Sequence, residues 1–128
     1  MAIKVEIAPG ELIDKLTILE IKLERIGDPA KLQRVRIEYD ILRAARDAEM
    51  PMSDRLQALA SRLKAINGRL WTIEDDIRDM ERARSFGPDF VALARSVYRT
   101  NDERAAVKRQ INELFDSAIV EEKSYAAY

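Results

Sequence analysis

Hydrophobic residues recur at helical spacing along most of the chain. Near the N-terminus, Leu12, Leu16, Leu19 and Leu23 step by four and three, the spacing of one face of an α-helix. We therefore predict a helix over residues 11–26. A second stripe lies roughly 100° around this helix, so we expect the helix to be central and covered on more than one side; the stripe comprises Ile13, Thr17 and Ile21.

Three further helices follow, separated by proline and glycine. Asp28 before Pro29 is typical of a helix start, and this second helix should end before Pro51. Ser53 is a candidate cap of a third helix, whose apolar seam keeps a three-four repeat for about 30 residues. Gly87-Pro88 ends this helix and begins a fourth. The seam consists of Leu56, Leu59, Leu63, Ile66, Leu70, Ile73, Ile77 and Met80.

The two ends of the chain lack this periodicity. Residues 3–7, with the sequence IKVEI, alternate apolar and polar side chains and fit either a short edge strand or an extended arm. The sequence thus predicts an all-α protein: an antiparallel bundle of about four helices in which the third and fourth form a long helical hairpin. Residues 1–128 should form one domain, with a short extended N-terminal arm at 1–10 and a C-terminal tail at 116–128.

Composition excludes many classes of chemistry. The 128 residues include no Cys and no His, which excludes disulfides, thiolate nucleophiles, Ser-His-Asp triads and zinc sites. Mg²⁺ on carboxylates stays compatible with the composition, but we expect no bound metal and no cofactor. Lys and Arg number 22 against 23 Asp and Glu, with both signs interleaved, and nucleic acid is therefore not an expected partner. No secretion signal and no membrane-spanning run is present, which favours a cytoplasmic protein without a membrane partner.

Polar residues occupy positions on the fourth helix where its apolar face should continue. On a helical wheel, Asn101, Arg104, Lys108 and Asn112 lie within about 40° of Phe90. A second polar row follows the seam of the third helix. We name as the polar stripe the candidate ligand-binding residues of both rows, together with one neighbouring tyrosine: Asn67, Trp71, Glu74, Arg78, Tyr98, Asn101, Arg104, Lys108 and Asn112.

Two interpretations of the polar stripe stay open at this stage. In one, its residues are open to water or form an internal network of ion pairs and amide hydrogen bonds; Glu74 and Glu81 have the right sign to pair with Arg104 and Lys108 across the hairpin. In the other, the stripe lines a cleft that holds an anion through its cations. There Asn101 and Asn112 would hydrogen-bond the ligand, and an aromatic residue would form an apolar wall; the cations are Arg78, Arg104 and Lys108, and the aromatic residue is Trp71 or Tyr98.

Two other groups of charges are interpreted as solvent-exposed. The acidic triplet 74–76 cannot chelate one ion, because successive helical residues point about 100° apart. On the first helix, charges should complement the helix dipole and face water, and Lys15 and Glu20 are the two that could reach the cleft. These first-helix charges are Glu11, Asp14, Lys15, Glu20 and Lys22.

Four stretches of the sequence form a recognisable set. They are PGELIDKLTILEIKLERI at 9–26, LWTIEDDIRDME at 70–81, FVALARSVYRTNDERAAVKRQIN at 90–112 and EEKSY at 121–125. Together they resemble a family of small bacterial and phage proteins of unknown function. The resemblance implies a shared helical domain, and it implies that the polar stripe from Trp71 onward belongs to the pattern of the family. It suggests a context of glycosyl transfer or surface polysaccharide but implies no activity. Where the family pattern has Gly-Ser, this chain has Asp116-Ser117.

Three kinds of function are compatible with these observations. The first is a non-catalytic bundle, expected to be a homodimer, that binds an anionic or sugar-like small molecule or a protein partner through the polar stripe. The second is a small all-helical enzyme acting on an anionic metabolite, so enzymatic activity stays undecided. The third is a structural oligomerisation module whose polar residues set helix register, as a coiled-coil seam allows. A closed, fully paired stripe would favour the third.

Overall fold

The chain folds into four α-helices and no β-strand, and the computed structural model describes every residue from 1 to 128. The prediction of an all-α protein with about four helices is therefore confirmed. The helices are α1 (Pro9–Arg25), α2 (Pro29–Glu49), α3 (Asp54–Arg82) and α4 (Pro88–Leu114).

Local sequence determines where the helices begin. The Asp28 side chain accepts a hydrogen bond from the backbone N–H of Ala30, and the Ser53 hydroxyl accepts one from Leu56. Both residues act as N-caps, as predicted, because a short polar side chain satisfies a backbone donor that has no partner within the helix. The first helix begins at Pro9, slightly earlier than predicted, so the N-terminal arm ends at Ala8.

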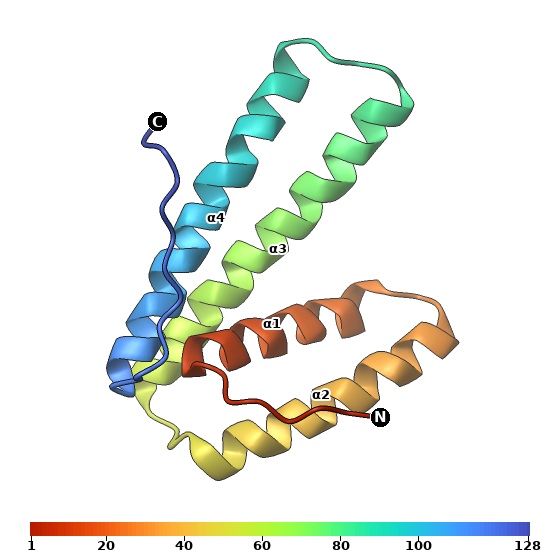
Figure 1. Ribbon diagram of the computed structural model, residues 1–128. Coiled ribbons are helices and arrows are strands. Elements are labelled where there is room, and N and C mark those ends of the chain that lie inside the picture. The colour runs from red at the N-terminus through yellow and green to blue at the C-terminus, as the bar shows by residue number, and fades with distance from the viewer.

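The helices form two hairpins that diverge from a shared base (Figure 1). Helices α3 and α4 make the long hairpin that the sequence predicted, and α1 crosses its base. Among the helices, α2 packs against α1 alone, whereas α1 packs against all three others. The expectation that the first helix is central is confirmed.

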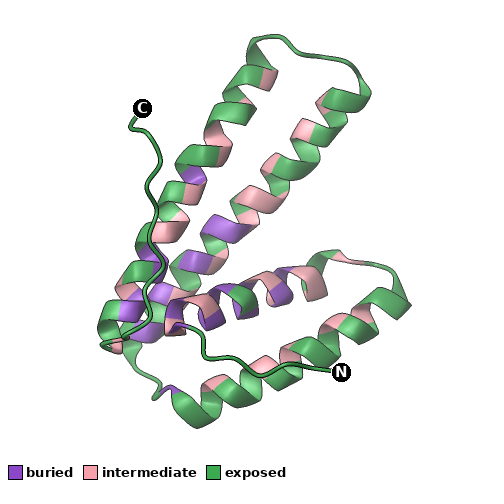
Figure 2. Ribbon diagram, in the orientation of Figure 1, coloured by how far each residue is buried: buried purple, intermediate pink, exposed green.

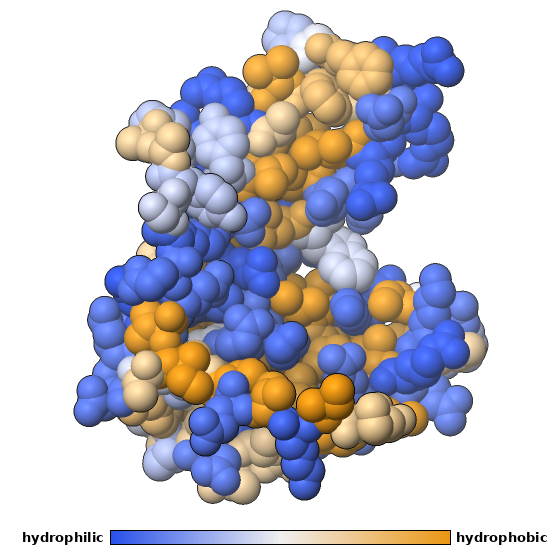
Figure 3. Space-filling model, in the orientation of Figure 1, coloured by the Kyte–Doolittle hydropathy of each residue, from blue (hydrophilic) through white to orange (hydrophobic).

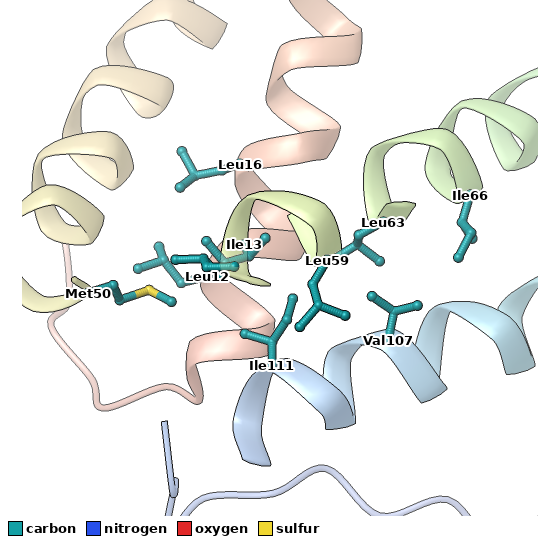
Figure 4. Packing of buried hydrophobic residues seen from close by; sticks show 10 residues of the cluster. Leu12, Ile13, Leu16, Met50, Leu59, Leu63, Ile66, Val107 and Ile111 are labelled. Atoms are coloured by element: carbon teal, nitrogen blue, oxygen red, sulfur yellow. The ribbon is translucent and has the colours of Figure 1, made fainter. Parts of the chain in front are cut away.

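The hydrophobic core lies where α1 crosses the long hairpin. Leu59, Leu63 and Ile66 of α3 face Val107 and Ile111 of α4 (Figure 4). Helix α1 completes this cluster with three apolar residues, and Met50 closes one end of it; the α1 residues are Leu12, Ile13 and Leu16. Burying such side chains stabilises the fold by about 1.5–3 kcal/mol each.

The long hairpin is covered over only half of its length. Buried residues are confined to the base of the hairpin and to α1, apart from Ala8 and Met50, and no residue from 68 to 99 is buried (Figure 2). We call residues 68–99 the distal half of the hairpin and the part that packs against α1 the proximal half.

Both chain ends run outside the helices. Residues 1–7 are exposed and carry no strand, so the arm is the correct one of the two interpretations for residues 3–7. The tail leaves α4 through Asp116, whose φ of 49° lies in the left-handed region that favours glycine. The next N–H, of Ser117, donates to the carbonyl of Asn112 at 3.0 Å and caps the helix. This geometry explains why glycine is expected at position 116.

Candidate functional site

A buried carboxylate, that of Asp14, lies at the centre of the junction between α1, α3 and α4. The residue is 1% exposed. Arg104 of α4 binds the carboxylate with two nitrogens: Nε donates to Oδ1 at 2.9 Å and Nη2 donates to Oδ2. Asn67 of α3 donates to the same Oδ1 at 2.9 Å. One side chain of α1 thus contacts both helices of the long hairpin. Its hydrogen bonds with Arg104 raise the pKa of the guanidinium above its ordinary value.

The remaining polar atoms around Asp14 are also paired. The Thr17 hydroxyl accepts a hydrogen bond from Asn67 at 3.0 Å and donates one to the backbone carbonyl of Asp14 at 2.8 Å. No side-chain nitrogen or oxygen atom that is itself fully buried lacks a hydrogen-bond partner. This matters because an unpaired buried polar group costs about 1–3 kcal/mol.

Lys108 brings a second cation into the junction. Its Nζ lies 2.9 Å from a carboxylate oxygen of Glu11, 2.6 Å from Glu121 and 4.0 Å from Asp14. Burial acts to lower the pKa of Lys108, but hydrogen bonds to Glu11 and Glu121 and the charge of Asp14 outweigh it, so the pKa is raised. The ammonium is therefore held in its charged form, which is unsuited to a lysine acting as a base.

The first turn of α1 docks directly on the backbone of α4. The N–H of Gly10 donates to Oδ1 of Asn112 at 2.7 Å. A Cβ added at Gly10 would lie 2.4 Å from the carbonyl oxygen of Lys108, so only glycine fits this approach. We call the whole assembly the buried network: Gly10, Glu11, Asp14 and Thr17 of α1, Asn67 of α3, Arg104, Lys108 and Asn112 of α4, and Glu121 of the tail.

The polar stripe is one continuous face of the long hairpin, and α1 covers only its proximal half. Asn67, Arg104, Lys108 and Asn112 contact α1. The other five members continue the same helical spacing toward the tip of the hairpin and form no hydrogen bond or ion pair with α1, whose last contact along α3 is the hydrogen bond from Arg25 to Thr72: Trp71, Glu74, Arg78, Tyr98 and Asn101. Ligand binding by these nine residues stays a prediction.

The predicted pairing of Glu74 and Glu81 with the cations of α4 is wrong. Arg69 of α3 pairs with Glu103 of α4, and this register places Arg104 near Asn67. Glu74 lies closer to the tip and pairs instead with Arg78 in its own helix, at 3.6 Å. The partners of Arg104 and Lys108 come instead from α1 and from the tail.

The prediction that Asp14 and Glu11 are solvent-exposed charges is also wrong. Asp14 is almost fully buried, and Glu11 faces Lys108. A signal for Asp14 was present in the sequence, because Asp14 is spaced from Thr17 and Ile21 as a member of their stripe. A carboxylate within a stripe that is otherwise buried needs a cation from elsewhere in the chain. Lys15 is exposed, as predicted, and Glu20 contacts Lys64.

The C-terminal tail folds back along α4 (Figure 1). Besides the contact between Glu121 and Lys108, Glu122 pairs with Arg109 at 3.0 Å, and the Tyr128 hydroxyl donates to Asp102 at 2.7 Å. The Tyr128 ring also lies 5.0 Å from the ring of Tyr98, measured between centroids. The tail therefore lies along α4 from Arg109 to Tyr98 and contacts two members of the polar stripe, Lys108 and Tyr98.

Both cations of the buried network are paired with carboxylates of the chain itself. Arg104 and Lys108 face three carboxylates, those of Glu11, Asp14 and Glu121. Each cation of the network is paired within the chain, as the structural interpretation of the stripe requires. No group of three or more acidic residues is arranged to hold a metal ion, and none of the four helices is long and apolar enough to cross a membrane.

We expect the tail to leave α4 in acid before the helices unfold. The hydrogen bond from Lys108 lowers the pKa of Glu121 in the folded protein. Ionised Glu121 thus holds the tail at neutral pH, and this contribution is lost as the pH falls below the ordinary glutamate value of about 4.3 and through the lower folded value. Amide NMR signals of residues 117–128 should become those of a disordered peptide while α3 signals persist. A tail that stays attached in acid until the helices themselves unfold would contradict this assignment.

Comparison with known proteins adds one observation. The pattern of a family of unknown function, DUF6165, matches residues 3–128. The chain belongs to this family. No curated protein and no solved structure matches it. The match to DUF6165 covers the arm from residue 3, all four helices and the tail. The buried network therefore lies wholly inside the family domain.

Proposed function

We propose that this protein is a non-catalytic structural module that forms a homodimer through the distal half of its long hairpin. The observation that carries this proposal is the uncovered seam: residues 68–99 continue the apolar repeat of the proximal half, yet none of them is buried. An apolar helix stripe is stable when another element covers it. In the proximal half that element is α1, and in the distal half it is absent from the single chain.

The seam of the distal half is only partly covered by the two helices of the hairpin. Its side chains are half-buried between the two helices, and Figure 3 shows hydrophobic colour running along the hairpin between hydrophilic flanks. Two helices alone cannot cover both sides of such a seam, whereas four helices in a bundle can. The seam residues concerned are Leu70, Ile73, Ile77 and Met80 of α3 and Phe90, Leu93 and Val97 of α4.

A second copy of the chain fits this face in charge. From Trp71 to Arg82, α3 carries five acidic and two basic residues, whereas α4 carries one acidic and two basic residues from Pro88 to Arg99. A two-fold axis that lays each α3 across the α4 of the partner brings opposite net charges together. The interface would also continue the face that already packs against α1 in the proximal half.

The two other functions receive less support. An anion cleft on the stripe face, where α1 packs, would need cations that are free on that face, but there Arg104 is paired with Asp14 and Lys108 with Glu11. An enzyme would need Glu74 or Lys108 poised for proton transfer beside an open pocket. Glu74 is exposed and pairs with Arg78, and the raised pKa of Lys108 keeps its ammonium protonated.

Two exposed alanines of α4 provide a matched test of the dimer. Ala94 and Ala92 lie on opposite sides of the α4 seam, and Ala94 shares the stripe face with Asn101. Ala94→Arg should raise the dimer dissociation constant at least about tenfold, because its long side chain takes the place of a methyl group where the helix of the partner packs. Ala92→Arg should leave the constant unchanged. Light scattering coupled to size-exclusion chromatography over a concentration series measures both.

Outcomes of this test separate the possible interfaces. A wild-type chain that stays monomeric at the highest concentrations used would overturn the proposal. A dimer that Ala94→Arg leaves intact would place the interface elsewhere on the molecule. Circular dichroism of both variants shows whether the hairpin still folds, as expected for exposed helix positions, where substitutions usually change stability by less than about 0.5 kcal/mol.

A further inference from the structure

A cavity of about 220 Å³ lies between the tail and α4. Lys108, Arg109 and Asn112 line it from α4, and Glu121 and Lys123 line it from the tail. Ala105 and Ala106 provide small side chains beside them. Three cations and an amide thus surround a space in which one carboxylate, that of Glu121, is the only acidic group.

Several donors around this cavity are not used by the protein. Asn112 accepts the Gly10 N–H through Oδ1, and its Nδ2 donates no hydrogen bond. Lys123 makes no ion pair, and its Nζ lies 5.9 Å from the ring centroid of Tyr125. Arg109 uses one nitrogen for Glu122, which leaves the rest of its guanidinium free. Free N–H donors of this kind bind the oxygens of phosphate or carboxylate groups.

Glu121 differs from the other two carboxylates that hold Lys108. Glu11 and Asp14 belong to α1, which the core fixes in place, whereas Glu121 belongs to a tail without secondary structure and its side chain is 48% exposed. Of the three carboxylates, it is the one that can leave without moving a helix. The cavity is therefore already used as an anion site, with the chain's own carboxylate as the bound anion.

We propose that this cavity is an oxyanion site, in which a phosphate or carboxylate group of another molecule replaces Glu121 on Lys108 and is held by Arg109, Lys123 and the Asn112 amide. The ligand is small, because the cavity is smaller than the roughly 300–1,000 Å³ of pockets for drug-sized molecules. Its binding releases the tail from α4. The site is independent of the dimer interface, since its lining lies on the proximal half of the hairpin and on the tail.

The test uses the full-length chain with inorganic phosphate and with succinate as probes. Titrations are followed by NMR through the Asn112 side-chain amide and the backbone amide of Lys123. Glu121→Gln removes the competing charge, so the apparent dissociation constant for the probe should fall about tenfold, the factor expected if the tail occupies the site for some nine-tenths of the time. When Arg109→Gln or Lys123→Gln is added to the Glu121→Gln variant, the affinity for the probe should fall severalfold.

Controls keep this proposal open to refutation. Lys31→Gln, at an exposed position at the start of α2, removes a charge outside the site and should leave probe affinity unchanged. Binding of phosphate alone identifies a phosphorylated ligand, and binding of succinate alone identifies a carboxylate ligand. Failure of Glu121→Gln to bind either probe more tightly than the wild type overturns the proposal. Unchanged affinity after Arg109→Gln and Lys123→Gln overturns it as well.

Discussion

Replacing Asp14 with alanine should lower the free energy of unfolding by about 3–5 kcal/mol, because it leaves Arg104 without its buried partner. The carboxylate accepts hydrogen bonds from both Arg104 and Asn67 at an almost fully buried position. Its loss leaves hydrogen-bond donors of two helices, Asn67 of α3 and Arg104 of α4, without an acceptor. Since single domains are stable by only about 5–15 kcal/mol, this one change removes a large part of the total.

Urea denaturation followed by circular dichroism measures this effect, and thermal unfolding should show a fall in Tm of about 10–20 °C. Asp75→Ala is the matched control, because Asp75 is an exposed acidic residue of α3 for which no ion pair is found. It should change stability by less than about 0.5 kcal/mol. If Asp14→Ala behaved like Asp75→Ala, the buried network would not be what joins α1 to the hairpin.

Features that depend on neighbouring residues could be predicted from the sequence. The caps of α2 and α3 use Asp28 and Ser53, as expected, and the apolar seam gave the length of α3 correctly as about 30 residues against 29 observed. The polar residues of α4 were also placed on one face by spacing alone. Such features follow from helix geometry, which is the same in every protein.

Features that depend on contacts between distant segments could not be predicted. Asp14 and Arg104 are 90 residues apart, and Gly10 and Asn112 are 102 apart. Charge matching alone was ambiguous, because the chain has 23 acidic residues that could pair with Arg104. Glu74 and Glu81 were chosen because they lie on α3, the helix that forms the hairpin with α4. Choosing among them needs the angle at which α1 crosses the hairpin, and that angle is set by core packing.

The polar stripe shows how one face can serve two purposes. Its proximal half carries Arg104 and Lys108, whose charges are neutralised by α1 and the tail. Its distal half carries Trp71 and Tyr98 beside a seam that no helix covers. The same periodicity therefore produces a closed junction where a third helix is present and an unpartnered surface where it is absent. A sequence wheel cannot distinguish the two, since it contains no information about α1.

Gly10→Ala should destabilise the protein by about 2–4 kcal/mol, although it adds a single methyl group. The new Cβ would lie 2.4 Å from the carbonyl oxygen of Lys108 and 2.9 Å from Oδ1 of Asn112. The first of these atoms is helix backbone and cannot swing away, so the N-terminal turn of α1 must move from α4. That movement strains the hydrogen bond between the Gly10 N–H and Asn112 and separates Glu11 from Lys108.

Gly68→Ala provides the control for this prediction, because Gly68 lies within α3 and its added Cβ would meet nothing closer than Arg25 Nη2 at 4.0 Å. There the change should raise stability by about 0.5–1 kcal/mol, since alanine loses less backbone entropy than glycine in a helix. Chemical denaturation of the two variants should thus give changes of opposite sign. Equal and small effects would mean that α1 tolerates displacement from α4. The buried network would then be a consequence of core packing between α1 and the hairpin, and the close approach at Gly10 would contribute little to holding the two together.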